Sequence, residues 1–111
     1  MLKKKILTTK KFHILVNKLI LKIEKKLDKY NGKLNIDYES YNKILKINIK
    51  YKNEMIISRQ EFLKQIWIAT KYKGYYFKYK NKKWICKKNN IEIKKFLNNF
   101  FKKHIKENIF C

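Results

Sequence analysis

The chain has 111 residues, of which 45% are hydrophobic and 15% aromatic, so it can bury the core of one domain. This length excludes a second domain or a nucleotide-binding α/β architecture of ordinary size. The 30 Lys and Arg against 8 Asp and Glu give a formal net charge of +22, which would attract nucleic acid, anionic lipid or acidic proteins.

A helical period comes first. Apolar side chains recur at steps of three and four from Phe12 to Tyr30, which makes one stripe along an amphipathic helix. Thr8 or Thr9 is predicted to cap its start. Asn31-Gly32, whose residues tolerate positive φ, is predicted to end it.

After this helix the hydrophobic period changes to two, which is typical of strands. The alternation predicts six short strands, at about 36–39, 45–51, 55–59, 65–70, 75–79 and 83–87. The connections between them are tight, so the strands must be antiparallel, because parallel pairs need a long crossover.

The helical period returns near the end of the chain, where five large apolar residues share one face: Ile93, Phe96, Leu97, Phe100 and Phe101. This order predicts an α+β fold, a two-layer sandwich in which the N- and C-terminal helices cover one face of an antiparallel sheet of about six strands. The other sheet face would lie open to water and is the natural place for a partner. We expect one domain over residues 1–111, with residues 1–10 as a frayed basic N-terminus.

The cysteines and the N-terminal residues indicate where in the cell the protein works. Cys86 and Cys111 form no CxxC pair and are predicted to be free thiols. No apolar run approaches the ~20 residues needed to span a bilayer. The basic N-terminus has no apolar region and no small-residue cleavage site, so we expect a protein that begins at Met1 and stays in a bacterial cytoplasm.

Three segments, in order, resemble the frataxin family, and its bacterial members most. The run from Phe12 to Gly32, followed by Ile36-Asp37, is similar to the first helix and strand of that family. The segment 57–77 carries Arg-Gln, Gln-x-Trp-x-Ala-Thr-Lys and Gly-Tyr-x-Phe, which resemble its most distinctive part. Trp84-Ile85-Cys86 resembles the strand that follows, and the likeness covers nearly the whole chain.

The resemblance implies a frataxin-like fold and an iron-binding accessory protein of iron–sulfur cluster assembly, not an enzyme. Such a protein docks on the cysteine desulfurase and the iron–sulfur scaffold protein. It holds iron, as Fe²⁺ or Fe³⁺, weakly, through carboxylates of the first helix and the strand after it, and needs no organic cofactor. No membrane or nucleic-acid partner is expected, and the large like-charge excess predicts a monomer.

The candidate iron ligands fall into separate groups. Glu24 and Asp28 form an i,i+4 pair whose oxygens can approach one hard cation. His13 lies on the same polar side of the helix but ~16 Å away along its axis. Asp37 and Glu39 point to the same side of their strand and make a second weak patch. The alternative is that these carboxylates only pair with neighbouring lysines, a surface interaction worth about 0–1 kcal/mol.

The resemblance also implies a partner-binding set on the open sheet face: Arg59, Gln60, Gln65 and Trp67. Ile66 and Ile68 need the helix-covered side, so strand alternation directs Trp67 outward. An exposed tryptophan among polar groups suits an interface anchor, whereas a tryptophan taken alone is more often a core residue.

A nucleic-acid-binding module is the alternative function. Residues 73–79, Lys-Gly-Tyr-Tyr-Phe-Lys-Tyr, are similar to the strand with which RNA-recognition motifs stack bases. However, Tyr76 replaces the expected Gly or Ala, and the chain starts with a helix. Arg59 is the only arginine, and Lys, Asn and Ile are written by A/T-only codons, so an A+T-rich genome would produce this composition without selection for a ligand. A third hypothesis is a purely structural subunit that has lost metal binding and contacts its partner only through the open sheet face.

Overall fold

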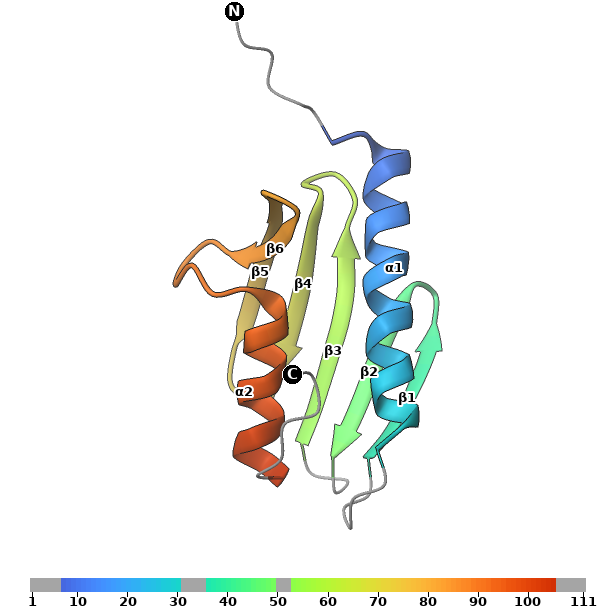
Figure 1. Cartoon of the computed structure of the whole chain (residues 1–111), viewed down its shortest axis with the longest axis vertical. Helices are drawn as coiled ribbons and strands as arrows, with labels where there is room; N and C mark the ends of the chain where they lie inside the picture. The colour runs from blue at the N-terminus through green and yellow to red at the C-terminus, as the bar shows by residue number, and fades with distance from the viewer. Residues whose placement is uncertain (1–6, 31–35, 50–52, 106–111) are drawn as a thin grey trace, which may run out of the picture.

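Two helices pack on one face of a six-stranded antiparallel sheet in this computed structural model, which describes residues 7–30, 36–49 and 53–105 (Figure 1). The elements follow in the order α1 (Thr9–Asp28), β1 (Ile36–Tyr41), β2 (Ile44–Ile49), β3 (Asn53–Gln60), β4 (Gln65–Thr70), β5 (Gly74–Lys80), β6 (Lys83–Cys86) and α2 (Ile93–Ile105). Each strand pairs with the next one in the chain, in the sheet order β1-β2-β3-β4-β5-β6. The predicted two-layer sandwich is confirmed.

The start of α1 follows the predicted capping chemistry. Thr8 is the N-cap, and its side-chain oxygen accepts a hydrogen bond from the backbone N–H of Lys11 at 3.1 Å. Thr9 and Lys10, expected in a frayed segment, instead belong to the helix. The helix ends at Asp28 with Lys29 as its C-cap, earlier than the predicted stop at Asn31-Gly32, which itself lies outside the described residues.

Two hairpins are closed by Asn-Lys pairs. Asn42-Lys43 joins β1 to β2 and Asn81-Lys82 joins β5 to β6, and the φ angles of all four residues lie between 49° and 63°. Two successive residues with positive φ make the type I′ turn, whose twist matches that of the flanking strands. The prediction that β2 reaches Tyr51 falls outside the described residues, and β6 ends at Cys86, one residue earlier than predicted.

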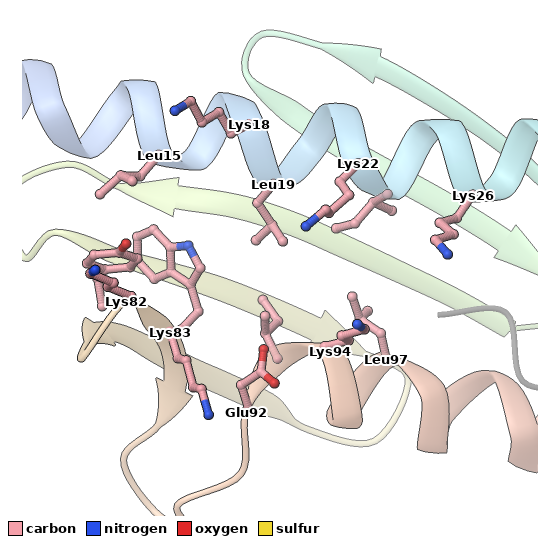
Figure 2. A pocket seen from close by; sticks show the side chains of 14 residues that line it. Leu15, Lys18, Leu19, Lys22, Lys26, Lys82, Lys83, Glu92, Lys94 and Leu97 are labelled. Carbon is pink, nitrogen blue, oxygen red and sulfur yellow. The ribbon is translucent and has the colours of Figure 1, made fainter. Parts of the chain in front are cut away.

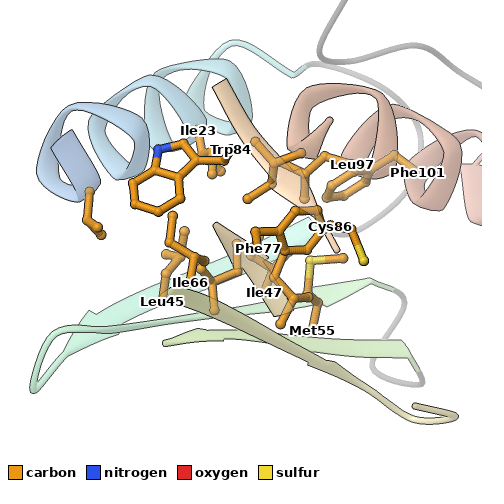
Figure 3. Close-up of a cluster of buried hydrophobic side chains, with 14 of the residues drawn as sticks. Ile23, Leu45, Ile47, Met55, Ile66, Phe77, Trp84, Cys86, Leu97 and Phe101 are labelled. Atoms are coloured by element: carbon orange, nitrogen blue, oxygen red, sulfur yellow. The ribbon is translucent and has the colours of Figure 1, made fainter. Parts of the chain in front are cut away.

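The core lies between the helices and the sheet (Figure 3). Ile47, Met55, Ile66 and Phe77 point toward the helices and have no exposed surface. Burying a side chain of this size stabilises the fold by about 1.5–3 kcal/mol. Cys86 is a buried free thiol, as predicted, whereas Cys111 lies outside the described residues.

Neither α1 nor α2, the helices of the described residues, lies over the opposite side of the sheet (Figure 1). We call it the open face, and it carries the side chains that alternate with the core positions of each strand. Neither helix in the described part of the chain is long and apolar enough to cross a bilayer.

Candidate functional site

An indole is held in a fixed orientation on the open face. Trp67 of β4 lies between Ile66 and Ile68, both buried, so its own side chain points the other way and is half-buried. Its Nε1–H donates to Oε1 of Gln65 at 2.8 Å. Its ring packs against Tyr76 of β5, its direct cross-strand neighbour, with ring centroids 5.0 Å apart. The predicted outward direction of Trp67 is therefore confirmed.

The predicted partner set does not share one face. Gln60 lies opposite Gln65 in the β3–β4 register and therefore joins Trp67 on the open face. The expectation that Arg59 lies on the open face is wrong. Arg59 lies opposite the buried Ile66, so strand alternation turns it to the helix side.

Arg59 instead connects β3 to α1. Its Nη1 donates to Nδ1 of His13 at 2.9 Å, and its Nη2 donates to Oδ1 of Asn17 at 2.8 Å. Partial burial lowers the pKa of Arg59, but an arginine stays charged at neutral pH. Arg59 thus fixes the position of α1 over the sheet and takes no part in the open face.

Sequence reasoning did not include Tyr76 among the partner-binding residues. Its side chain is 53% exposed beside Trp67, and it alternates with the fully buried Phe77. That alternation was a usable signal, because one buried residue of a strand directs both neighbours outward. Tyr76 therefore extends the aromatic surface of the open face.

Charge on the open face is divided between its two edges. Asp37 and Glu39 of β1 are exposed at one edge. Glu54 of β3 forms an ion pair with Lys46 of β2, with Nζ 3.2 Å from Oε2, and this hydrogen bond raises the pKa of Lys46. Toward the other edge, β5 exposes lysines, including Lys78. The aromatic pair lies between a mainly acidic edge and a basic one.

The acidic pair of α1 lies on the helix side, over the edge strand β1. Asp28 accepts a hydrogen bond from the hydroxyl of Tyr38 at 2.7 Å, and Glu24 accepts one from the hydroxyl of Ser40. The hydrogen bond to Asp28, with burial and the nearby negative charges, raises the pKa of Tyr38 to about 12. Tyr38 is therefore a neutral donor at physiological pH. In each carboxylate these bonds occupy one oxygen, and among the described residues no side chain donates a hydrogen bond to the other oxygen.

The candidate iron ligands are not gathered in one place. Asp37 and Glu39 alternate with Tyr38, so they lie on the sheet face opposite to Glu24 and Asp28. The part of the chain that the structure describes contains no group of three or more His, Cys, Asp or Glu side chains able to hold a metal ion. The structure thus offers two carboxylate pairs, one on each side of the β1 edge.

His13, also a candidate iron ligand, uses its ring nitrogens for hydrogen bonds within the protein. Its Nε2 lies 2.6 Å from Oε1 of Glu61, and its Nδ1 faces Arg59. The hydrogen bond to His13 also lowers the pKa of Glu61. Both ring nitrogens are engaged, so His13 is poorly suited to bind a metal, and it lies far from the acidic pairs.

The aromatic residues of the RNA-binding alternative are covered by α2. Tyr75 and Phe77 hold the positions that would stack bases, yet both ring faces turn to the helix side. Their ring centroids lie 4.6 Å and 5.4 Å from that of Phe96. A base cannot reach Phe77, which has no exposed surface.

Comparison with known proteins gives one consistent family. The family model described as frataxin-like domain matches residues 5–107. The protein named iron-sulfur cluster assembly protein CyaY from Buchnera aphidicola subsp. Baizongia pistaciae is 53% identical over 75 residues, covering 68% of this chain and 64% of that protein. The protein of the same name from Buchnera aphidicola subsp. Acyrthosiphon pisum is 48% identical over 91 residues, covering 78% of each. The chain thus matches less than two thirds of the length of the first relative.

Solved structures agree in fold. Frataxin from Psychromonas ingrahamii has a TM-score of 0.83 and 31% identity, with coverage of 91% of this chain and 94% of that one. A trimeric frataxin from Saccharomyces cerevisiae, complexed with ferrous iron, has a TM-score of 0.68 at 18% identity, over 96% of this chain and 94% of that one. At this identity the yeast protein shares the fold alone.

Proposed function

This chain belongs to the frataxin-like family, and we propose that it is an accessory protein of iron–sulfur cluster assembly. In this role it docks on the cysteine desulfurase and the scaffold protein through its open face, and it carries iron weakly as cargo. It acts as a monomer in a bacterial cytoplasm and is not itself an enzyme. The name shared by its bacterial relatives supports the general role.

The docking proposal rests on one observation, the Trp67–Tyr76 pair on a sheet face that no helix covers. Aromatic anchors contribute most of the binding energy in many interfaces. The hydrogen bond to Gln65 and the contact with Tyr76 hold the indole in place before binding, which lowers the entropy lost on association. The acidic and basic edges on either side would orient a partner of complementary charge.

The iron proposal rests on the two carboxylate pairs. Fe²⁺ accepts oxygen ligands of this kind, and each α1 carboxylate keeps one oxygen free of the bond from β1. Two carboxylates without a closed cage bind a cation weakly, with water as the remaining ligands. Weak binding suits a protein that must release iron to a partner.

Docking can be tested with the purified desulfurase–scaffold complex of the same bacterium. Trp67→Ala should weaken binding at least about tenfold, since truncated hot-spot residues commonly cost 2 kcal/mol or more. Tyr72→Ala is the matched control, because Tyr72 is 73% exposed but lies in the turn between β4 and β5. Equal affinity of Trp67→Ala and the unaltered protein would refute the docking proposal.

Iron binding can be tested by anaerobic Fe²⁺ titration followed through the backbone amide signals. We expect broadening at residues 24–28 and, separately, at residues 37–39. The double variant Glu24→Gln/Asp28→Asn should lose the first effect and keep the second. Glu61→Gln serves as the control, because Glu61 is paired with His13 away from both sites. Broadening centred on His13, or none at all, would refute this part of the proposal.

A further inference from the structure

A groove lies between the two helices, on the side of the sheet opposite to the open face (Figure 2). Its volume is about 510 Å³, which is within the range of about 300–1,000 Å³ that small ligand pockets occupy. Its interior is apolar: Leu15 and Leu19 of α1 are partly exposed there, and Trp84 of β6 and Leu97 of α2 line it from the other side. We call it the lysine groove because six lysines surround this interior: Lys18, Lys22, Lys26, Lys82, Lys83 and Lys94.

Three of these lysines have a regular spacing. Lys18, Lys22 and Lys26 follow each other at four-residue steps along α1, so their Cα atoms are about 6 Å apart along the helix axis. Figure 2 shows Lys22 and Lys26 extending from α1 toward α2. Among the described residues, Glu92 supplies the one carboxylate that lines the groove. The rim therefore carries a strong positive charge above an apolar interior, and Lys22 and Lys26, four residues apart on α1, both extend across it.

We infer that the lysine groove binds an acidic amphipathic helix of a partner protein. A helix laid along α1 places apolar residues at i, i+3, i+4 and i+7 into the groove. Glutamates or aspartates spaced four residues apart along the flank of this apolar stripe repeat with the same spacing of about 6 Å as the lysines. Burial of the apolar residues of the partner helix in the groove provides the affinity. The lysines favour partner helices that carry negative charge. This inference concerns the helix side of the molecule and is independent of the role proposed for the open face.

Other occupants fit the groove less well. A second copy of this chain would bring a net charge of +22 against the same lysines. A single-stranded nucleic acid needs aromatic faces for stacking. Trp84 is 5% exposed and is packed edge-on against Phe12 and Tyr79, so it offers no free face.

The test uses the full chain and a synthetic peptide with leucines at i, i+3, i+4 and i+7 and glutamates four residues apart along both flanks of this leucine stripe, where they face the lysines of the rim. A scrambled peptide of the same composition is the peptide control. We expect the amphipathic peptide to bind at least about tenfold more tightly than the scrambled one. Its addition should shift the backbone amide signals of residues 15–26 and 93–97. Equal affinity for both peptides, or shifts centred on the open face, would overturn the inference.

Charge reversal tests the lysines. Lys22→Glu/Lys26→Glu should weaken peptide binding at least about tenfold, whereas Lys10→Glu/Lys78→Glu, which changes the net charge equally outside the groove, should weaken it less than about threefold. Should the first variant not fold, Lys22→Gln/Lys26→Gln replaces it. Equal losses in both variants, displacement of the peptide by an oligonucleotide of equal charge, or binding only after removal of residues 106–111 would each contradict the inference. The last result would identify the chain's own C-terminal segment as the occupant.

Discussion

Arg59 of β3 donates a hydrogen bond from Nη1 to Nδ1 of His13 on α1, at 2.9 Å. A guanidinium can only donate, so Nδ1 must be the acceptor and the proton of the neutral imidazole must lie on Nε2. That proton faces Oε1 of Glu61 at 2.6 Å. The chain Arg59–His13–Glu61 therefore joins a strand, a helix and the β3–β4 turn through one tautomer of one histidine.

Replacing the arginine should destabilise the fold without altering the open face. Arg59→Met removes the hydrogen bonds to His13 and Asn17. Hydrogen bonds that involve a charged group contribute about 1.5–3 kcal/mol when buried, and we expect about 1–2 kcal/mol for this partly exposed pair. Urea unfolding measures the change, with Lys78→Met as a control expected to lie within about 0.5 kcal/mol of the unaltered protein. Loss of less than that for Arg59→Met would show that the packing of α1 suffices without it.

The hydrogen bond between Glu61 and His13 should make the stability of the fold depend on pH in the acid range. The hydrogen bond from His13 lowers the pKa of Glu61 from its ordinary value of 4.5. A lowered pKa in the folded state contributes stability above pH 4.5, and this contribution is lost as the pH falls through the folded-state value. The difference in unfolding free energy between the unaltered protein and Glu61→Gln should therefore shrink as the pH falls below about 4.5. A difference that grows toward low pH would contradict this assignment.

The sequence predicts the fold well because its signals are local. The period-two alternation of β2 and β4 and the apolar stripe of α1 each follow from burial of one face. The direction of Trp67 follows in the same way from its two isoleucine neighbours. The signal for the Asn-Lys hairpins is weaker, because Lys43 and Lys82 stand where glycine is usual for positive φ.

The site is predicted less well because its contacts join distant residues. The alternation that directs Trp67 outward also places Arg59 on the helix side, but that step needs the β3–β4 register, in which Arg59 faces Ile66. Similarly, the bond between Tyr38 and Asp28 depends on how α1 lies over the edge strand. The spacing of residues along the chain does not predict how the strands pair or how α1 lies over the edge strand.

The lysines in the two hairpins predict a gain in stability. Most residues adopt the left-handed conformation at a cost of about 1–2 kcal/mol. Glycine avoids this cost, and asparagine reduces it. Lys43→Gly and Lys82→Gly should therefore each stabilise the protein by about 0.5–1 kcal/mol, measured as a higher urea midpoint. Lys88→Gly is the control, since Lys88 is not among the residues with positive φ and glycine should bring no gain there. A destabilising effect of Lys82→Gly would show that the lysine side chain itself supports this turn.

Tyr38 should ionise well above the ordinary tyrosine pKa of 10, because its hydroxyl donates to Asp28 and its pKa is raised to about 12. A raised pKa contributes stability that is fully present below pH 10 and is lost as the pH rises toward 12. Tyrosine ring carbon signals, assigned with Tyr38→Phe, report the titration directly. Asp28→Asn removes the charged acceptor and should return the pKa toward 10, whereas Asp37→Asn on the other sheet face should leave it unchanged.

Truncation of the two tryptophans should destabilise the fold to very different extents. Trp84 is 5% exposed and packs against Phe12 and Tyr79 between the helix layer and the sheet, so Trp84→Ala leaves a cavity and should cost about 3–5 kcal/mol of unfolding free energy. Trp67 is half-buried on the open face, and its main ring contact is Tyr76, a type of contact worth about 0.5–1.5 kcal/mol. Trp67→Ala should therefore cost about 1 kcal/mol, and urea unfolding separates the two outcomes. A loss at Trp67 as large as that at Trp84 would mean that the indole of Trp67 is needed for the fold itself, and a fall in partner binding by Trp67→Ala would then no longer indicate an interface.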